Sequence, residues 1–181
     1  SIPANLQPVF YVESASLAET IRDINKYSNN VMAQHLFLTL SQQQRGVGSF
    51  DASRDVMQRW WRDRVGGDVP TFDNGSGLSR EERISAQALA RLLQTAWASA
   101  SMPELMSSLP ITGLDGTLKR SKAQFSAHLK TGSLRDVAGI AGFVDGPNGK
   151  RWVLVAVLHH ANANAARPAL DAMVDWVAQQ P

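Results

Sequence analysis

The 181-residue sequence contains no cysteine. This absence excludes disulfide bonds, zinc sites built on thiolates and a cysteine nucleophile. It leaves the cellular compartment open, because exported proteins without disulfides also exist.

Long apolar runs and clusters of one charge are also missing. The longest apolar run, residues 152–158, is far shorter than the roughly 20 residues of a membrane-spanning helix. The 18 Lys and Arg residues nearly balance the 16 Asp and Glu residues, and neither sign forms a run, so we expect no nucleic-acid partner. Residues 1–5 lack the basic start and apolar core of a signal peptide, so none is expected in this chain.

What is present fits an ordinary globular chain. Hydrophobic residues make up 44% and charged residues 19%, with 13 glycines and 8 prolines. These proportions exclude collagen-like, disordered and disulfide-scaffold proteins. A chain of this size buries roughly 70% of its unfolded surface, which is enough for one core.

The chain changes character after Pro110. Before it, apolar residues mostly recur with the helical period; after it, short β-prone runs follow one another. We expect a short β-prone segment at residues 7–13, helices near residues 17–26, 31–40, 51–65, 85–97, 103–109 and 166–178, and strands at 126–134, 137–144 and 151–159. The last two strands are joined as a hairpin through the turn at residues 145–149. The sequence therefore predicts an α/β or α+β layer architecture.

Two short motifs are candidates for chemistry. Ser28-x-Asn30 lies at a predicted helix junction, and Lys130-Thr131-Gly132, followed by Ser133, lies within a predicted strand. Each motif alone is weak, and Ser28 and Asn30 also suit helix caps. A glycine inside a strand lets another backbone approach closely, which favours a binding edge.

Read together, these motifs resemble two of the three motifs of the serine penicillin-recognising enzymes: S-x-x-K, S-x-N and K-T-G. The resemblance is most specific to the class C low-molecular-mass penicillin-binding proteins, which are D-alanyl-D-alanine carboxypeptidases and endopeptidases. It extends from about residue 11 to the C-terminus and is carried by blocks at residues 25–33, 73–80, 109–117 and 129–134. It implies the β-lactamase/DD-peptidase α/β fold, with residues 1–181 forming the C-terminal part of the penicillin-binding domain.

The resemblance also implies roles for six residues. Ser28 would relay a proton towards the leaving nitrogen, and Asn30 would hold the substrate backbone and orient the catalytic lysine. Lys130 would hold Ser28 and attract the terminal carboxylate of the substrate, which the hydroxyls of Thr131 and Ser133 would bind. Gly132 would let the substrate lie against the strand, and the Ser133 N–H would form half of an oxyanion hole.

The S-x-x-K motif, which carries the nucleophile and its base, is absent. None of the five lysines has a serine three residues before it. The chain therefore resembles an incomplete, C-terminal fragment of a larger enzyme that by itself does not acylate. The resemblance implies peptidoglycan stem peptides and β-lactam antibiotics as partners, a periplasmic or cell-envelope location, and neither a metal nor another cofactor.

Several alternatives accompany this interpretation. The chain could be a non-catalytic envelope module that binds peptidoglycan, or a true β-lactamase, although no base for deacylation is evident.

We interpret residues 73–79 as a turn followed by a capping box from Ser79 to Glu82. His159 and His160 end a strand and point to opposite faces, which disfavours a shared metal.

Truncation predicts one structural feature. In the family, strands that precede the nucleophile complete the sheet. The strand at residues 151–159 is therefore expected to have an unpaired edge that is covered by the N-terminal segment, paired with a neighbouring molecule or left open. Two further strands from this chain would contradict the truncation.

Overall fold

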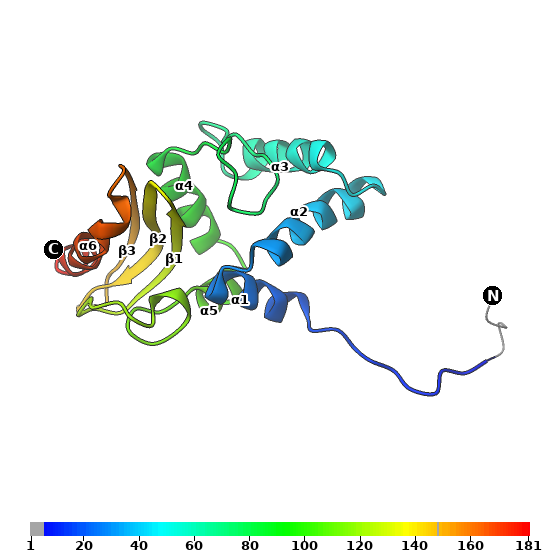
Figure 1. Cartoon of the computed structure of the whole chain (residues 1–181), viewed down its shortest axis with the longest axis horizontal. Coiled ribbons are helices and arrows are strands. Elements are labelled where there is room, and N and C mark those ends of the chain that lie inside the picture. The colour runs from blue at the N-terminus through cyan, green and yellow to red at the C-terminus, as the bar shows by residue number, and fades with distance from the viewer. Residues whose placement is uncertain (1–5, 148) are drawn as a thin grey trace.

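The computed structural model describes residues 6–147 and 149–181. Its helices and strands follow the predicted order (Figure 1). The α-helices are α1 (Leu17–Tyr27), α2 (Asn30–Arg45), α3 (Phe50–Arg64), α4 (Ala86–Trp97), α5 (Met102–Ser108) and α6 (Arg167–Ala178). The strands are β1 (Ala127–Leu134), β2 (Val137–Asp145) and β3 (Arg151–His159), and the short 3-10 helices are η1 (Gly116–Leu118) and η2 (Ala163–Ala166).

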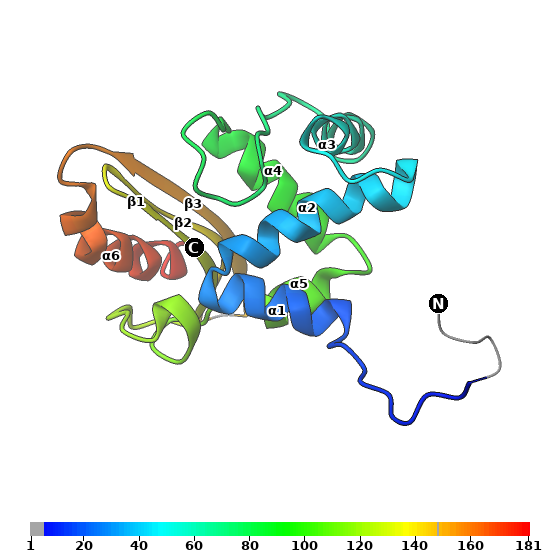
Figure 2. The same cartoon turned by 45° about the vertical axis from the view of Figure 1, so that its right-hand side comes forward.

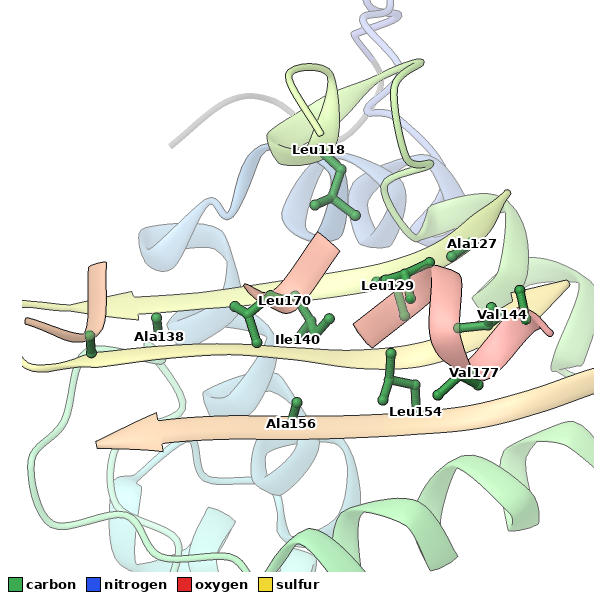
Figure 3. Close-up of a cluster of buried hydrophobic side chains, with 13 residues drawn as sticks. Leu118, Ala127, Leu129, Ala138, Ile140, Val144, Leu154, Ala156, Leu170 and Val177 are labelled. Carbon is green, nitrogen blue, oxygen red and sulfur yellow. The ribbon is translucent and has the colours of Figure 1, made fainter. Parts of the chain in front are cut away.

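The three strands form one antiparallel sheet in the order β1-β2-β3. Helix α6 packs against one face, and α4 contacts the other face as part of the helical block α1–α5 (Figures 1 and 2). Side chains at alternating strand positions form the main core with α6, as Figure 3 shows; this core includes Leu129, Ile140, Leu154, Leu170 and Val174.

The helical block is held together by smaller contacts. The fully buried Ser53 hydroxyl of α3 donates to the Phe37 carbonyl of α2 at 2.7 Å and pairs with Ser41 at 2.8 Å. Trp61 of α3 packs edge-on against Phe72 and lies close to Ala88 of α4. These contacts join α2, α3 and α4 on the side of the sheet opposite α6.

The β-prone segment at residues 7–13 is not a strand, and this prediction was wrong. Val9 is 99% exposed, and residues 6–16 extend away from the sheet (Figures 1 and 2). A single extended segment gains little without a partner strand to pair its backbone groups.

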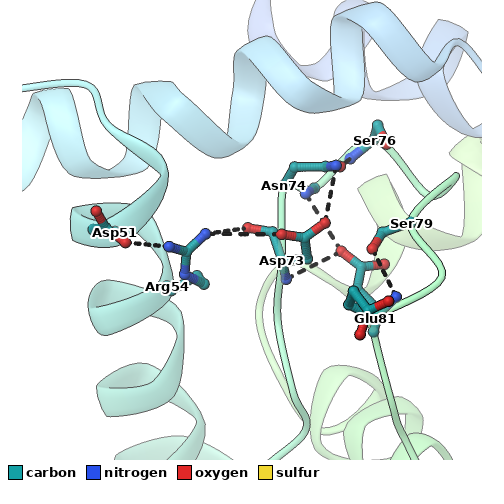
Figure 4. A network of polar contacts seen from close by, with 9 residues as sticks. Asp51, Arg54, Asp73, Asn74, Ser76, Ser79 and Glu81 are labelled. Carbon is teal, nitrogen blue, oxygen red and sulfur yellow. Dashed lines mark hydrogen bonds and ion pairs between the residues drawn. The ribbon is translucent and has the colours of Figure 1, made fainter.

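The capping box from Ser79 to Glu82 was also wrong. No helix begins at Ser79; the next helix starts at Ala86 with Ser85 as its N-cap. The Glu82 carboxylate instead accepts from the Asp73 and Gly75 N–H groups, each at 3.4 Å. The surrounding polar network (Figure 4) stabilises a turn, as the rest of that interpretation predicted.

The outer edge of β3 has no partner strand within the described residues, as the truncation predicts. The N-terminal segment from residue 6 onward does not cover it (Figure 1). Within the same part of the chain, no helix combines the length and apolar character needed to cross a membrane.

Candidate active site

Ser28 occupies a strained turn between two helices. It caps the C-terminus of α1, where its N–H donates to the Ile24 carbonyl, and has left-handed backbone angles of φ 54° and ψ 50°. Among the described residues it is the one non-glycine with positive φ. Asn29 then caps α2 by accepting from the Met32 N–H at 3.1 Å. Left-handed geometry at a residue other than glycine costs on the order of 1 kcal/mol, and such strain clusters at functional sites.

Lys130 of β1 meets Ser28 although 102 residues separate them. Its Nζ donates to the Ser28 Oγ and, at 3.0 Å, to the Thr131 carbonyl. Burial lowers the pKa of Lys130. No carboxylate lies within ion-pair distance of this ammonium among residues 6–147 and 149–181. A partly buried cation without a carboxylate is suited to attract an anionic ligand.

Asn30, the first residue of α2, faces the same space. Its Nδ2 donates to the Ser76 carbonyl at 2.6 Å. The turn that carries Ser76 packs closely on α2, because a Cβ added at Gly75 would lie 2.4 Å from the Phe37 Cβ. The block at residues 73–80, which the sequence marked mainly as a turn, therefore forms a wall of the site.

Thr131 and Ser133 lie on the face of β1 opposite Lys130, since alternate strand residues point to opposite faces. The Thr131 and Thr117 hydroxyl oxygens lie 2.7 Å apart. The Ser133 Oγ donates to the Asn164 Oδ1 at 2.8 Å. Both hydroxyls thus have protein partners in this structure, which the sequence did not indicate.

Gly132 lies between them with open space around it, because an added Cβ would have no neighbour within 4 Å. All six predicted site residues line one cleft of about 1230 Å³. The structure therefore brings the two motifs together in a single cavity. The side chains of these six residues supply hydroxyls, an amide and a cation. No cluster of three or more His, Asp or Glu side chains suited to a metal occurs in the described part of the chain.

A partly buried ion pair beside Ser28 was missed from the sequence. Lys26 is 7% exposed; its Nζ donates to the Leu109 carbonyl at 2.7 Å and to Asp115 Oδ2 at 2.6 Å. Burial acts to raise the pKa of Asp115, but the hydrogen bonds from Lys26 and the Ile111 N–H outweigh it, so the pKa is lowered.

This pair ties the α1 terminus to the segment that carries Thr117. Lys26 lies two residues before Ser28, and Asp115 lies two residues before Thr117. The pair therefore links the end of α1, which carries Ser28, to the segment of Thr117, whose hydroxyl contacts Thr131 of the K-T-G motif. The two residues fall inside blocks of the resemblance, but nothing local to either block signals that they meet.

The chain is similar in sequence to known D-alanyl-D-alanine carboxypeptidases. The D-alanyl-D-alanine carboxypeptidase of an Actinomadura species is 31% identical over 150 residues, which cover 76% of this chain and 27% of that protein. The D-alanyl-D-alanine carboxypeptidase DacB of Haemophilus influenzae is 27% identical over 157 residues, or 81% of this chain and 32% of that protein. The chain thus spans about a third of the length of these relatives.

A solved structure confirms the fold class. Penicillin binding protein 4 (dacB) from Haemophilus influenzae, complexed with a novel β-lactam, superposes with a TM-score of 0.73 at 22% identity, covering 88% of this chain and 40% of that chain. The model of the D-Ala-D-Ala carboxypeptidase 3 (S13) family matches residues 1–180. The predicted family resemblance is confirmed: the chain belongs to the D-Ala-D-Ala carboxypeptidase 3 (S13) family.

Proposed function

We propose that this chain is the C-terminal part of a serine-type D-Ala-D-Ala carboxypeptidase/endopeptidase that cleaves peptidoglycan stem peptides through an acyl-enzyme and is acylated by β-lactams. The observation that carries the proposal is the contact between Lys130 Nζ and Ser28 Oγ inside the cleft that Asn30 also lines. Membership of the family and the β-lactam bound by a structural relative support it.

The chemistry follows from these groups. An acyl transfer needs a nucleophile, a proton for the leaving amine and donors for the oxyanion. Ser28 would pass a proton to the leaving nitrogen, with Lys130 holding its hydroxyl. Asn30, whose amide is fixed by Ser76, would hold the substrate backbone. The Ser133 N–H would be one oxyanion donor.

The β1 edge suits an added substrate strand. Residues before the K-T-G motif already have partners, since the Leu129 N–H donates to the Pro110 carbonyl at 2.9 Å. Beyond them, Gly132 lies in open space within the cleft. A peptide ending in D-Ala-D-Ala would pair there and place its carboxylate near Lys130 and Thr131, with rotation of the hydroxyl from Thr117.

The nucleophile would come from outside this sequence, since no serine here precedes a lysine by three residues. We propose a periplasmic or cell-envelope location, where stem peptides occur. The competing candidate is a non-catalytic envelope module that binds peptidoglycan; the lack of S-x-x-K beside an intact Lys130 cleft is what favours it.

Intact-mass spectrometry with labelled penicillin tests the proposal. We expect no adduct on the 181-residue chain and one adduct per molecule on the full product of its gene, abolished by replacing the serine of an upstream S-x-x-K motif. An upstream sequence without S-x-x-K, or a full product that never acylates, would favour the binding module. A stoichiometric adduct on the short chain would overturn the missing nucleophile.

A further inference from the structure

The β1 edge divides the cleft into two walls of different character. Leu129 packs in the core with α6, whereas its neighbour Lys130 reaches Ser28 in the helical block. Odd-numbered residues of β1 therefore face α6 and even-numbered ones face the helical block. In agreement, Thr131 contacts Thr117 in η1, and the Ser133 hydroxyl contacts Asn164 in η2.

The charged residues that line the cleft are distributed unevenly between its two walls. The helical-block wall is built from neutral residues, among them Ser28, Asn30 and Leu78, with Lys130 entering from β1. Every other charged residue of the cleft lies on α6 or directly after η1, on the side that the odd-numbered residues of β1 face: Lys119, Arg120, Arg167 and Asp171. We call the three cations of this set, Lys119, Arg120 and Arg167, the cationic wall. The whole chain has a net charge of only +2, so this concentration is local.

The single carboxylate of that wall already has partners. Asp171 accepts from the Ser121 hydroxyl at 2.7 Å and from the Lys122 N–H at 2.9 Å. Lys119, Arg120 and Arg167 are exposed, and within the described residues no carboxylate lies within ion-pair distance of them. Arg167 also opens α6, whose N-terminal dipole favours anions. Three cations without carboxylate partners along one wall suit an anionic group of a ligand.

We propose that the cationic wall binds a second carboxylate of the peptide ligand, separate from the terminal carboxylate near Lys130. This inference rests on the proposed function, because it takes the ligand to be a peptide strand added to β1. Side chains of an added strand alternate between the two walls. The acidic side chain must therefore sit at a position that projects towards α6, and its immediate neighbours must not.

The test is a titration of the ¹⁵N-labelled 181-residue chain with short D-Ala-D-Ala peptides. Glutamate is placed at each of the three successive positions that precede the D-Ala-D-Ala pair, and each peptide is compared with its glutamine isostere. Amides of residues 130–133 report the β1 edge, and those of Lys119, Arg120 and Arg167 report the cationic wall.

We expect glutamate to bind about fivefold tighter than glutamine at low salt, at alternate positions only, because exposed ion pairs are individually weak. The preference should vanish near 1 M salt, where charges are screened beyond about 3 Å. It should also vanish in the variant that combines Lys119→Gln, Arg120→Gln and Arg167→Gln. Lys122→Gln is the matched control, since Lys122 is an exposed cation of the same segment that does not line the cleft.

The two proposals fail in different ways. Shifts at residues 130–133 without any glutamate preference would overturn the cationic wall and leave the proposed function standing. A glutamate preference that survives the triple substitution would also overturn the cationic wall. Shifts at the cationic wall alone would count against peptide binding at β1, and no shift at either set would count against both proposals.

Discussion

The two edges of the sheet differ in how their side chains and backbone are supported. Along the β1 edge, Lys130, Thr131 and Ser133 each have a named partner on another element: Ser28, Thr117 and Asn164. Along β3, no strand in residues 6–147 and 149–181 pairs with the outer side, and Val157 is 58% exposed. A strand edge whose polar side chains are held by hydrogen bonds suits a ligand. An unpaired edge with exposed apolar side chains suits pairing with another strand.

The difference teaches which edge belongs to the site. Both edges offer unpaired backbone groups, so exposure alone does not separate them. What separates them is the cleft, which all six predicted site residues of the β1 side line and no residue of β3 lines. The β3 edge is the one expected from the sequence to lack a partner strand, and no strand of the described residues pairs with it.

The largest expected effect concerns the glycine that lets β1 pair with β2. A Cβ at Gly142, which has φ 154°, would lie 2.1 Å from the His128 carbonyl oxygen. We expect Gly142→Ala to lower the free energy of unfolding by about 3 kcal/mol, because the backbone must shift. Chemical denaturation measures this change.

Gly132→Ala is the matched control for that substitution. An added Cβ at Gly132 has no neighbour within 4 Å, so stability should change by less than about 1 kcal/mol. Peptide binding should nevertheless weaken, because the methyl group would meet the added strand. Equal stability losses for both glycine variants would contradict the distinction between them.

The next effect concerns the partly buried Lys26–Asp115 pair that supports the β1 side. Asp115→Asn leaves the Lys26 ammonium buried without its counter-charge. We expect the free energy of unfolding to fall by about 2 kcal/mol. This is less than for a fully buried pair, because the Asp115 side chain is 38% exposed. Because the folded-state pKa of Asp115 is lowered, this stabilisation is present above about pH 4 and is lost as pH falls below it.

Urea denaturation from pH 7 to pH 3 measures both the loss and its pH dependence. The difference in stability between the wild type and Asp115→Asn should narrow towards the acidic end, as the unfolded-state carboxyl becomes protonated. Asp55→Asn, which removes an exposed pair with Arg45, should stay within about 0.5 kcal/mol of wild type. A gap between the wild type and Asp115→Asn that does not narrow at all between about pH 5 and pH 3 would show that the ion pair is not its cause.

Removing the cation of the β1 edge should affect binding more than folding. Lys130→Met keeps an unbranched side chain of similar length but removes the ammonium that contacts Ser28. We expect affinity for a D-Ala-D-Ala peptide to fall about tenfold, the scale of a lost charged hydrogen bond. Calorimetric titration measures it, with exposed Lys150→Met as the unaffected control. An unchanged affinity would remove Lys130 from the binding site.

The smallest effect on stability is expected at the opposite edge. A charge on an edge strand opposes pairing with another chain, so Val157→Lys should reduce any self-association of this protein. Because Val157 is exposed, stability should change by less than about 0.5 kcal/mol. Sedimentation at several concentrations measures the association. Stronger association of the lysine variant would show that the bare β3 edge is not the contact.

Most helices and strands can be predicted from local sequence patterns. Apolar periodicity and the Ser85 cap place α4, and alternating runs around the turn at residues 145–149 place the hairpin. The failures have physical causes. Residues 7–13 have β propensity but no partner strand, and Glu82 satisfies loop N–H groups instead of capping a helix.

The candidate site is predictable only where motifs carry it. Ser28, Asn30 and Lys130 are found through their motifs, and the structure places them in one cleft. The Lys26–Asp115 pair and the contact of Asn164 with Ser133 depend on tertiary packing across many residues, so no local pattern reveals them.

The most direct test of the central claim is a titration of the ¹⁵N-labelled chain with acetyl-Lys-D-Ala-D-Ala and its L-Ala-L-Ala isomer. Our account predicts that the D,D peptide shifts the amides of residues 130–133 and of Ser28, while those of β3 remain unchanged and the L,L isomer shifts neither set. Shifts along β3 in place of β1, or equal responses to both isomers, would contradict it.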